Sequence, residues 1–270
     1  MDTKTLISFL SENDGFIEIP IYQRAYEWES SQIDQFIDDL DHFMSSEDEY
    51  PHFFGMVVLV TKDDISNSGD IEIIDGQQRI TTFCLLLSMI RDWLLYESQR
   101  DDSYKMDRNK STRLMSRFDT QIMKALYEEE SIVDQKYIPK LKSKNTKPHE
   151  SEITHFMLCD FERIKSNRRN EDENYLTTRE KLFHVSSRED VFNDNEGQSE
   201  DPESENYNEF YNCFENLTAK SSKSRAIVKN YKQIKDQFFM EKIGNLQPNE
   251  RSEKLDKLLD VVLKRFRIIP

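Results

Sequence analysis

The sequence predicts an α+β fold, with a small mixed-sheet unit first and a mostly helical unit after it. Two observations support this prediction. Short apolar runs of strand character, such as residues 53–60 and 71–74, occur within the first hundred residues. From Asp101 onward the strand patterns disappear, and amphipathic, charge-rich segments take over. We therefore expect one domain over residues 1–98 and a helical extension over residues 99–270, each within the usual size of a domain.

The first unit alternates helices and strands. The segment from Glu29 to Gln32 offers an N-cap before a helix whose apolar side chains recur at helical spacing. Residues 53–60 are aromatic and β-branched, which is typical of a strand buried on both faces. The predicted elements are a helix over 3–12, a strand over 16–21, a helix over 33–40, a strand over 53–60, a loop over 62–70, a strand over 71–74 and a helix through 83–95.

The second unit contains segments that interrupt its helices. Residues 128–130 and 166–174 are charged or polar and are interpreted as solvated breaks. Residues 194–208 contain no Lys, no Arg and no aliphatic side chain, which is typical of a surface loop. Two further helices are predicted over residues 224–241 and 250–267.

The formal net charge of the 270-residue chain is −15, and it is unevenly distributed. The first 60 residues contain 13 acidic and 2 basic side chains, whereas residues 211–270 contain 7 acidic and 13 basic ones. Nonspecific binding of duplex DNA depends on many Lys and Arg side chains, so the protein as a whole is not expected to hold DNA electrostatically. Basic clusters that form either one positive face or solvated helix surfaces lie at residues 136–147, 163–169 and 220–235.

The cysteines and the longest apolar run exclude several classes of protein. Cys84, Cys159 and Cys213 have no paired spacing, which argues against a disulfide framework or a zinc site, and Cys84 is expected in the core. The apolar run over residues 80–96 is interrupted by charged side chains, so it predicts a buried helix and not a membrane span. We expect a cytoplasmic protein with no membrane partner. The five histidines form no His-Me finger pattern, which sets aside a histidine-rich metal nuclease.

Residues 75–82, with the sequence Asp-Gly-Gln-Gln-Arg-Ile-Thr-Thr, join an apolar strand to a helix through a turn centred on Gly76. Glycine allows a sharp turn and a close approach to a ligand, so a positive φ is expected there. Unpaired amides in the first helical turn would point at an anion, and the Arg79 guanidinium can hold phosphate oxygens in a fork. The alternative is a surface turn in which Thr81 or Thr82 only caps a core helix.

A second motif lies at residues 19–28, where Ile-Pro-Ile-Tyr-Gln-Arg-Ala-Tyr-Glu-Trp places three aromatic residues and an arginine after Pro20. Followed by His-Phe-Phe-Gly at 52–55 and Asp-Gly-Gln-Gln-Arg at 75–79, it resembles the N-terminal domain of the GmrSD and SspE restriction proteins. The resemblance covers residues 16–97 and implies a ParB/sulfiredoxin-like fold. Segments that resemble the helical extension of this family lie at 141–156, 230–232 and 255–269.

The resemblance implies a prokaryotic anti-phage or modification-dependent restriction module that binds and hydrolyses a nucleoside triphosphate with Mg²⁺. In such proteins a separate C-terminal HNH-type nuclease domain or subunit cuts the DNA. The other expected partners are DNA modified by glucosylated hydroxymethylcytosine or by backbone phosphorothioate, and a further copy of the chain in a homo-oligomer. The apolar segment at residues 267–270 is interpreted as the end of a fragment or of a separate NTPase subunit.

Hydrolysis of a nucleoside triphosphate needs neutralised phosphate charge and a water in line with the scissile bond. Asp75 is the natural partner of the metal or of the water. Gln77 and Gln78 can orient water or contact phosphate or ribose, and Arg79 would offset charge that develops on the phosphate. The remaining residues assigned to nucleotide or phosphate binding are Gly76, Thr81, Thr82, Gln23 and Arg24.

Aromatic side chains beside the site divide into functional and structural ones. Tyr22 is expected to stack on a base, with Arg24 contacting DNA, whereas Trp28 is expected to pack and His52 to be structural. Sulfiredoxin chemistry is not expected, because Gln77 stands where that enzyme uses a cysteine. Three functions stay open: an NTPase that senses modified DNA and licenses a nuclease, a DNA-binding module without turnover, and a ParB-like nuclease. If Gln23 and Arg24 serve the same site as the turn, their strand is expected to run beside the strand over residues 71–74.

Overall fold

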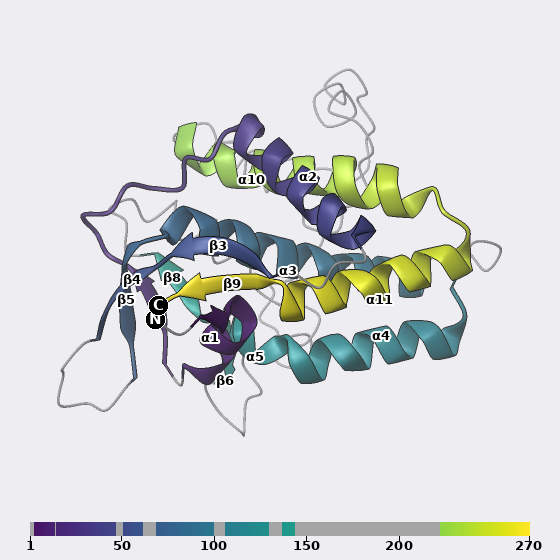
Figure 1. Ribbon diagram of the computed structural model, residues 1–270, viewed down its shortest axis with the longest axis horizontal. Helices are drawn as coiled ribbons and strands as arrows, with labels where there is room; N and C mark the ends of the chain where they lie inside the picture. The colour runs from purple at the N-terminus through teal and green to yellow at the C-terminus, as the bar shows by residue number, and fades with distance from the viewer. Residues whose placement is uncertain are drawn as a thin grey trace, which may run out of the picture.

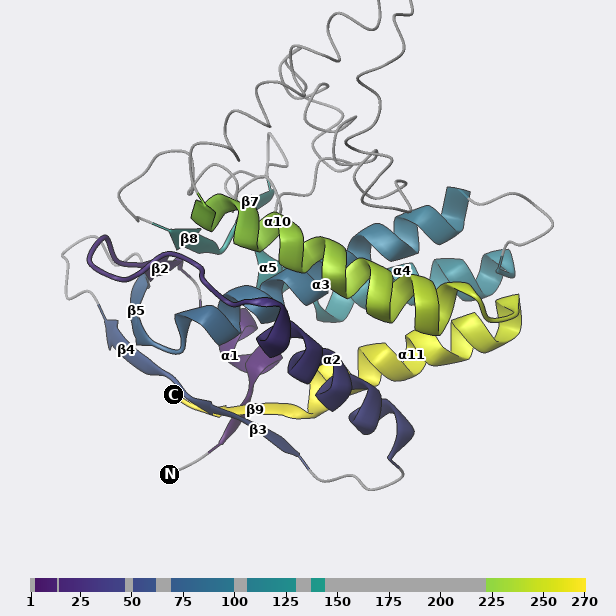
Figure 2. The same cartoon turned by 90° about the horizontal axis from the view of Figure 1, so that it is seen from above.

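The computed structural model describes residues 3–13, 15–46, 51–61, 69–99, 106–129, 137–143 and 222–270. The strands gather at one end of the molecule, and the long helices run from them toward the other end (Figures 1 and 2). This arrangement confirms the predicted α+β class. The basic cluster at 163–169, the breaks at 166–174 and the loop at 194–208 lie outside the described residues.

A four-stranded sheet with the strand order β4-β5-β2-β8 leads into the turn at Gly76. Its central pair is parallel, with Ile17 of β2 opposite Ile71 of β5. The strand that leads into the 19–28 motif therefore runs beside the strand that leads into the turn, as predicted. Ile17 and Ile19 of β2 and Ile71 and Ile73 of β5 are buried. The strands are β4 (Val58–Thr61), β5 (Ile71–Asp75), β2 (Ile17–Ile19) and β8 (Leu141–Ser143).

A three-stranded sheet joins the two ends of the described chain. Strand β9 (Phe266–Ile269) lies between β1 (Lys4–Thr5), to which it is antiparallel, and β3 (His52–Met56), to which it is parallel. The prediction that strands end before Asp101 is therefore wrong, since β8 and β9 lie far beyond it. A further pair, β6 (Tyr127–Glu129) and β7 (Tyr137–Pro139), also lies in the second half of the chain.

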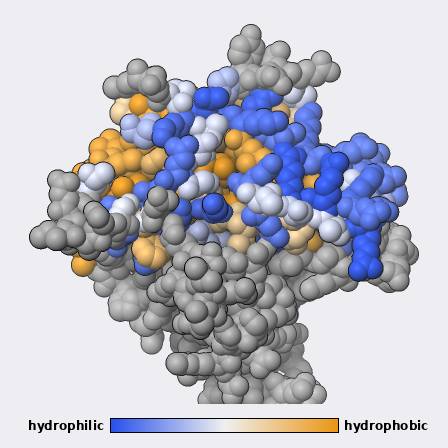
Figure 3. Space-filling view, turned by 90° about the horizontal axis from the view of Figure 1, so that it is seen from below, coloured by the Kyte–Doolittle hydropathy of each residue, from blue (hydrophilic) through white to orange (hydrophobic). Residues whose placement is uncertain are grey.

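The strand predicted over residues 53–60 is two strands that belong to different sheets. The chain leaves β3 and enters β4 at Val57, whose N–H donates to the Ile269 carbonyl at 3.0 Å. Its expected burial on both faces is wrong as well, because both strands form sheet edges and expose apolar side chains. The exposed side chains are Phe53, Met56, Val58 and Val60. Figure 3 shows apolar colour at this end of the molecule and polar colour over the helical end.

Helix α3 (Gln77–Gln99) forms the centre of the molecule, and its apolar residues from Phe83 to Leu94 are buried. This confirms the predicted core helix, including a buried Cys84. At α2 the Gln32 side chain accepts from the Glu29 N–H at 2.8 Å, as the predicted cap requires. The other helices are α1 (Leu6–Glu12), α2 (Ser30–Ser45), α4 (Arg108–Gln121), α5 (Met123–Leu126), α10 (Ser222–Ile234), η3 (Lys235–Gly244) and α11 (Pro248–Lys264).

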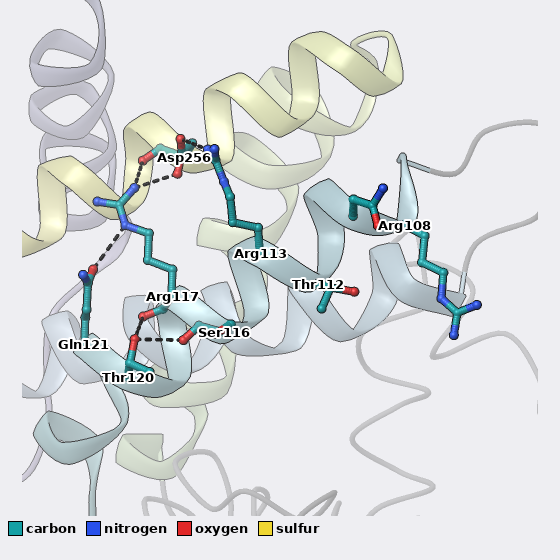
Figure 4. Close-up of a pocket in the computed structure, with 9 residues that line it drawn as sticks. Arg108, Thr112, Arg113, Ser116, Arg117, Thr120, Gln121 and Asp256 are labelled. Atoms are coloured by element: carbon teal, nitrogen blue, oxygen red, sulfur yellow. Dashed lines mark hydrogen bonds and ion pairs between the residues drawn. The ribbon is translucent and has the colours of Figure 1, made fainter.

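Helix α11 ends at Lys264, two residues before β9 begins, so the helix predicted over 250–267 is too long. Ion pairs hold this helix to α4: Arg117 contacts Asp256 at 2.6 Å and Asp260 at 2.5 Å. Arg113 also reaches Asp256, so two of the three arginines that line the open hollow of about 770 Å³ on α4 are directed at α11 (Figure 4). None of the helices in the described residues combines the length and the apolar character needed to cross a bilayer.

Candidate functional site

Gly76 is the single residue between the last residue of β5, Asp75, and the first residue of α3, Gln77. Its φ of +93° confirms the predicted positive value. The helix begins at once, because the Ile80 N–H donates to the Gly76 carbonyl at 3.1 Å. Amides in the first turn of a helix have no intrahelical acceptor, and a glycine has no side chain to cap them. The start of α3 is therefore suited to receive an anion.

Arg79 lies at the mouth of this turn, across the junction of β3 and β4. Its Nη2 donates to the Met56 carbonyl at 2.8 Å and stands 3.8 Å from the Asp75 carboxylate. The side chain of Arg79 is 31% exposed and that of Asp75 is 69% exposed. A long, exposed ion pair of this kind is weak, so both charged groups are accessible to a ligand.

The segment that we name the motif loop, residues 20–28, is attached to the turn by side chains from both motifs. The Gln23 Nε2 donates to the Ile74 carbonyl at 2.9 Å, and the Gln77 Nε2 donates to the Arg24 carbonyl at 3.1 Å. These bonds confirm that the two motifs meet at one place. The Arg24 guanidinium is exposed and lies 4.0 Å from the Glu27 carboxylate, so its backbone contacts the site while its side chain reaches solvent.

Gln78 fastens the motif loop to α3 with both ends of its amide. Its Nε2 donates to the Ala25 carbonyl at 2.8 Å, and its Oε1 accepts from the Glu27 N–H at 2.9 Å. The side chain is buried, and protein backbone occupies both polar groups. In this arrangement Gln78 has a structural role. Its predicted contact with water, phosphate or ribose stays a prediction.

Gln77 has one polar group in use and one without a partner. Because its Nε2 must face the Arg24 carbonyl, the orientation of the amide is fixed and its Oε1 points elsewhere. Within the described residues this buried oxygen meets no donor. An acceptor of this kind is normally satisfied by water or by another donor group, so Gln77 retains hydrogen-bonding capacity that Gln78 does not.

A directed chain of hydrogen bonds runs from α10 to the first turn of α3. The Thr82 hydroxyl donates to the Gln78 carbonyl at 3.0 Å, so its oxygen must accept from the Tyr26 hydroxyl at 2.7 Å. The Tyr26 oxygen in turn accepts from the Asn230 Nδ2 at 3.2 Å, and the same nitrogen donates to the Trp28 carbonyl at 2.7 Å. We call Asn230, Tyr26 and Thr82 the polar chain.

Burial of the polar chain has two consequences for the site. It raises the pKa of Tyr26 to about 12, an effect that the hydrogen bonds to Thr82 and Asn230 partly oppose. The Thr82 side chain is buried as part of this chain, and the neighbouring Thr81 side chain is buried as well, so neither hydroxyl faces solvent. Any phosphate at the start of α3 would therefore meet backbone amides and Arg79 before either hydroxyl, and the contacts assigned to Thr81 and Thr82 stay predictions.

The aromatic residues divide as expected. Trp28 packs on Phe36 with ring centroids 6.5 Å apart, which confirms its structural role. His52 lies among aromatic rings, 4.7 Å from Phe43 by centroids, and burial lowers its pKa, so it is structural as well. Tyr22 is 67% exposed in the motif loop and is available to a ligand.

Three described lysines from the basic clusters at 136–147 and 220–235 do not contribute to a positive face, and the face itself stays one of two interpretations. Lys140 and Lys235 are buried, and the Lys140 ammonium donates to the Leu10 carbonyl at 2.9 Å. The Lys142 ammonium lies 3.0 Å from the centre of the Phe16 ring. These three side chains are buried or contact neighbouring groups of the protein. The cluster at 163–169 lies outside the described residues.

A metal at this site would have few protein ligands. Among the described residues no group of three or more His, Cys, Asp or Glu side chains is placed to hold a metal ion. Mg²⁺ in nucleotide sites is commonly held by one or two carboxylates together with phosphates and water. The single exposed carboxylate of Asp75 fits such a nucleotide-borne ion.

Two residues that shape the site, Gly55 and Asn230, were not predicted from the sequence. Both lie in segments that carry the resemblance, at 52–55 and 230–232, but those segments offered no chemistry for either residue. Gly55 lies directly against the Arg79 guanidinium, and Asn230 is fully buried at the start of the polar chain. Only the folded chain shows their neighbours.

Comparison with known protein families gives a match over most of the chain. The model of the family described as GmrSD restriction endonuclease, N-terminal domain, matches residues 5–267. A search of curated proteins finds no match. The matched range includes the motif loop, the turn at Gly76, Asn230 and the first residues of β9, so it covers the elements that form the site on both sides of residue 98.

Proposed function

Because the chain belongs to the family of the GmrSD restriction endonuclease N-terminal domain and is thus a restriction-system component, we propose that it binds and hydrolyses a nucleoside triphosphate at the start of α3. The observation that carries the proposal is the convergence of three features within the turn. These are the helix start directly after Gly76, the accessible Arg79 guanidinium and the exposed Asp75 carboxylate.

The chemical roles follow from charge and reach. Backbone amides of the first turn and the partial positive charge of the helix start hold phosphate oxygens. Arg79 is fixed at one N–H by Met56, and its remaining donors oppose charge that develops on the transferred phosphoryl group. Asp75 would hold Mg²⁺, which when bound neutralises phosphate charge. The Oε1 of Gln77 is buried and has no donor within the described residues, so after a small movement it would accept a hydrogen bond from water or ribose.

The motif loop is proposed to connect nucleotide hydrolysis to modified DNA. Tyr22 and Arg24 are exposed on this loop and offer a stacking surface and a cation for a glucosylated or phosphorothioate site. The same loop is bonded to the first turn of α3 through Gln77 and Gln78. DNA that displaces the loop would therefore alter the phosphate site, and the resulting signal would license an HNH-type nuclease in a separate domain or subunit.

A DNA-binding module without turnover is the second candidate. It is favoured by the structural duty of Gln78, which leaves fewer side chains free for water activation than the sequence offers. In that case nucleotide would bind at the turn, and no phosphate would be released. The two candidates therefore differ in a single measurement.

The test is phosphate release by the purified protein with each NTP and Mg²⁺, with and without modified DNA. Arg79→Ala should lower turnover by about 10²–10³, the scale for one preorganised charge-stabilising donor. Arg108→Ala is the matched control, because Arg108 is an exposed arginine on α4 that points away from Asp256 (Figure 4). Unchanged hydrolysis in a folded Arg79→Ala protein would contradict the proposal, and binding without any hydrolysis by the unmodified chain would favour the second candidate.

A further inference from the structure

We infer that Gly55 is a positioning residue that holds Arg79 at the phosphate site, an inference that rests on the proposed function for its catalytic consequence. Gly55 has a φ of +111°, a conformation that side chains with a Cβ rarely adopt. A Cβ built on it would lie 1.8 Å from the Arg79 Nη1 and 2.6 Å from its Cζ. The guanidinium therefore occupies the space that any other residue would need.

The backbone around Gly55 is shaped to bring the arginine in. The pairing of β3 with β9 shifts register between Phe53 and Gly55, which is the irregularity of a β-bulge. The next residue, Met56, then presents its carbonyl to the Arg79 Nη2 at 2.8 Å. Bulges beside functional sites commonly serve to redirect a group in this way.

Gly76 closes the other side of the guanidinium. A Cβ on Gly76 would lie 3.5 Å from the Arg79 Nη2, an ordinary contact, whereas a Cβ on Gly55 could not coexist with the guanidinium in its present position, so the flexible arginine side chain would have to move away. We call Gly55 and Gly76 the glycine cradle. Of its two members only Gly55 decides where the guanidinium lies, because a side chain there must expel it.

Expulsion of Arg79 should resemble its removal. In Gly55→Ala the guanidinium would lose the Met56 carbonyl and its position beside Asp75. Turnover should therefore fall by about as much as in Arg79→Ala, by about 10²–10³. Adding Gly55→Ala to Arg79→Ala should lower turnover no further, because residues that act as a unit are not additive.

A double-mutant cycle of Gly55→Ala and Arg79→Ala tests the inference through thermal stability as well as turnover. Gly55→Ala should lower the melting temperature more when Arg79 is present than when residue 79 is alanine, because only in the first background does the substitution break the hydrogen bond from Arg79 to the Met56 carbonyl. Gly69→Ala is the control: Gly69 also has a positive φ, of +66°, and its substitution should shift the melting temperature equally in both backgrounds. Backbone strain alone would give that equal shift.

The outcomes separate the inference from the proposed function. Equal melting-temperature shifts for Gly55→Ala in the two backgrounds would overturn the positioning role, whatever the hydrolysis. If Gly55→Ala alone fails to fold, the double variant should still fold, and a double variant that also fails would overturn it too. An unmodified protein without hydrolysis would overturn the proposed function and leave the stability cycle to decide on Gly55.

Discussion

Removing one oxygen atom from Tyr26 should destabilise the protein by about 1–3 kcal/mol. The Tyr26 hydroxyl makes two buried hydrogen bonds, to Thr82 and from Asn230, and each buried bond of this kind contributes about 0.5–1.5 kcal/mol net. In Tyr26→Phe neither partner is left wholly without a bond. Thr82 still donates to the Gln78 carbonyl, and Asn230 still donates to the Trp28 carbonyl, so a larger loss is not expected.

Tyr22→Phe is the matched control, since it deletes the same atom from an exposed side chain in the same motif loop. Its effect on the unfolding free energy should stay within about 0.5 kcal/mol, as for most surface changes. Urea unfolding, followed by circular dichroism with equal slopes for all variants, measures both changes. Equal stabilities of Tyr26→Phe and Tyr22→Phe would refute the claim that the polar chain supports the fold.

The pH dependence gives an independent check. The pKa of Tyr26 is about 12 in the folded protein and about 10 in the unfolded chain, so the contribution of its proton is complete below pH 10 and is lost between pH 10 and 12. At about 1.4 kcal/mol per pH unit, this amounts to about 3 kcal/mol. Burial raises the pKa of Cys84 to about 12 as well, so only the part that disappears in Tyr26→Phe belongs to Tyr26.

Three further predictions concern the turn, the aromatic cluster and DNA. Gly76→Ala should lower stability by about 1–3 kcal/mol, the cost of strained backbone, because the alanine would have to adopt a φ of +93° and its Cβ would lie 3.1 Å from the Val57 Cγ2. Nucleotide affinity should fall as well. Urea unfolding measures the first change and nucleotide titration the second. His52→Gln should flatten the loss of stability as pH falls below about 6.5, because burial lowers the pKa of His52 and favours its neutral form in the folded protein. The 270-residue protein with Mg²⁺ or Mn²⁺ should leave supercoiled plasmid intact; nicking that disappears in Asp75→Ala would instead support a ParB-like nuclease.

The turn at Gly76 could be predicted from the sequence because its geometry is local. One glycine between an apolar strand and an apolar helix leaves few conformations, and the observed φ at Gly76 is one of them. The adjacency of Gln23 to Ile74 follows from two strands that lie side by side in a sheet. The turn is local, whereas Gln23 meets Ile74 across 51 positions of sequence, and that meeting was predicted from the expectation that both motifs serve one site.

The strands beyond residue 101 could not be predicted, because nothing local marks them. Phe266 to Ile269 alternate between buried and partly buried side chains, but four residues are too few to distinguish this period from the end of the preceding helix. β9 becomes a strand because β1 and β3 flank it. The two edge strands were misjudged for the opposite reason: their apolar composition predicts burial, yet no strand covers them within the described residues.

The side-chain contacts of the site depend on the same long-range closure. Asn230 meets Tyr26 across 204 positions of sequence, and β9 lies beside the strand that holds Gly55. The domain boundary at residue 98 stays a prediction, but the three-stranded and the four-stranded sheet each use strands from either side of it. Asn230 binds Tyr26 and Trp28, and Gln78 binds Ala25 and Glu27 of the same loop, so a displacement of α10 must either break the bonds of Asn230 or move the motif loop. The same loop contacts the first turn of α3, so these hydrogen bonds connect α10 to the proposed phosphate site.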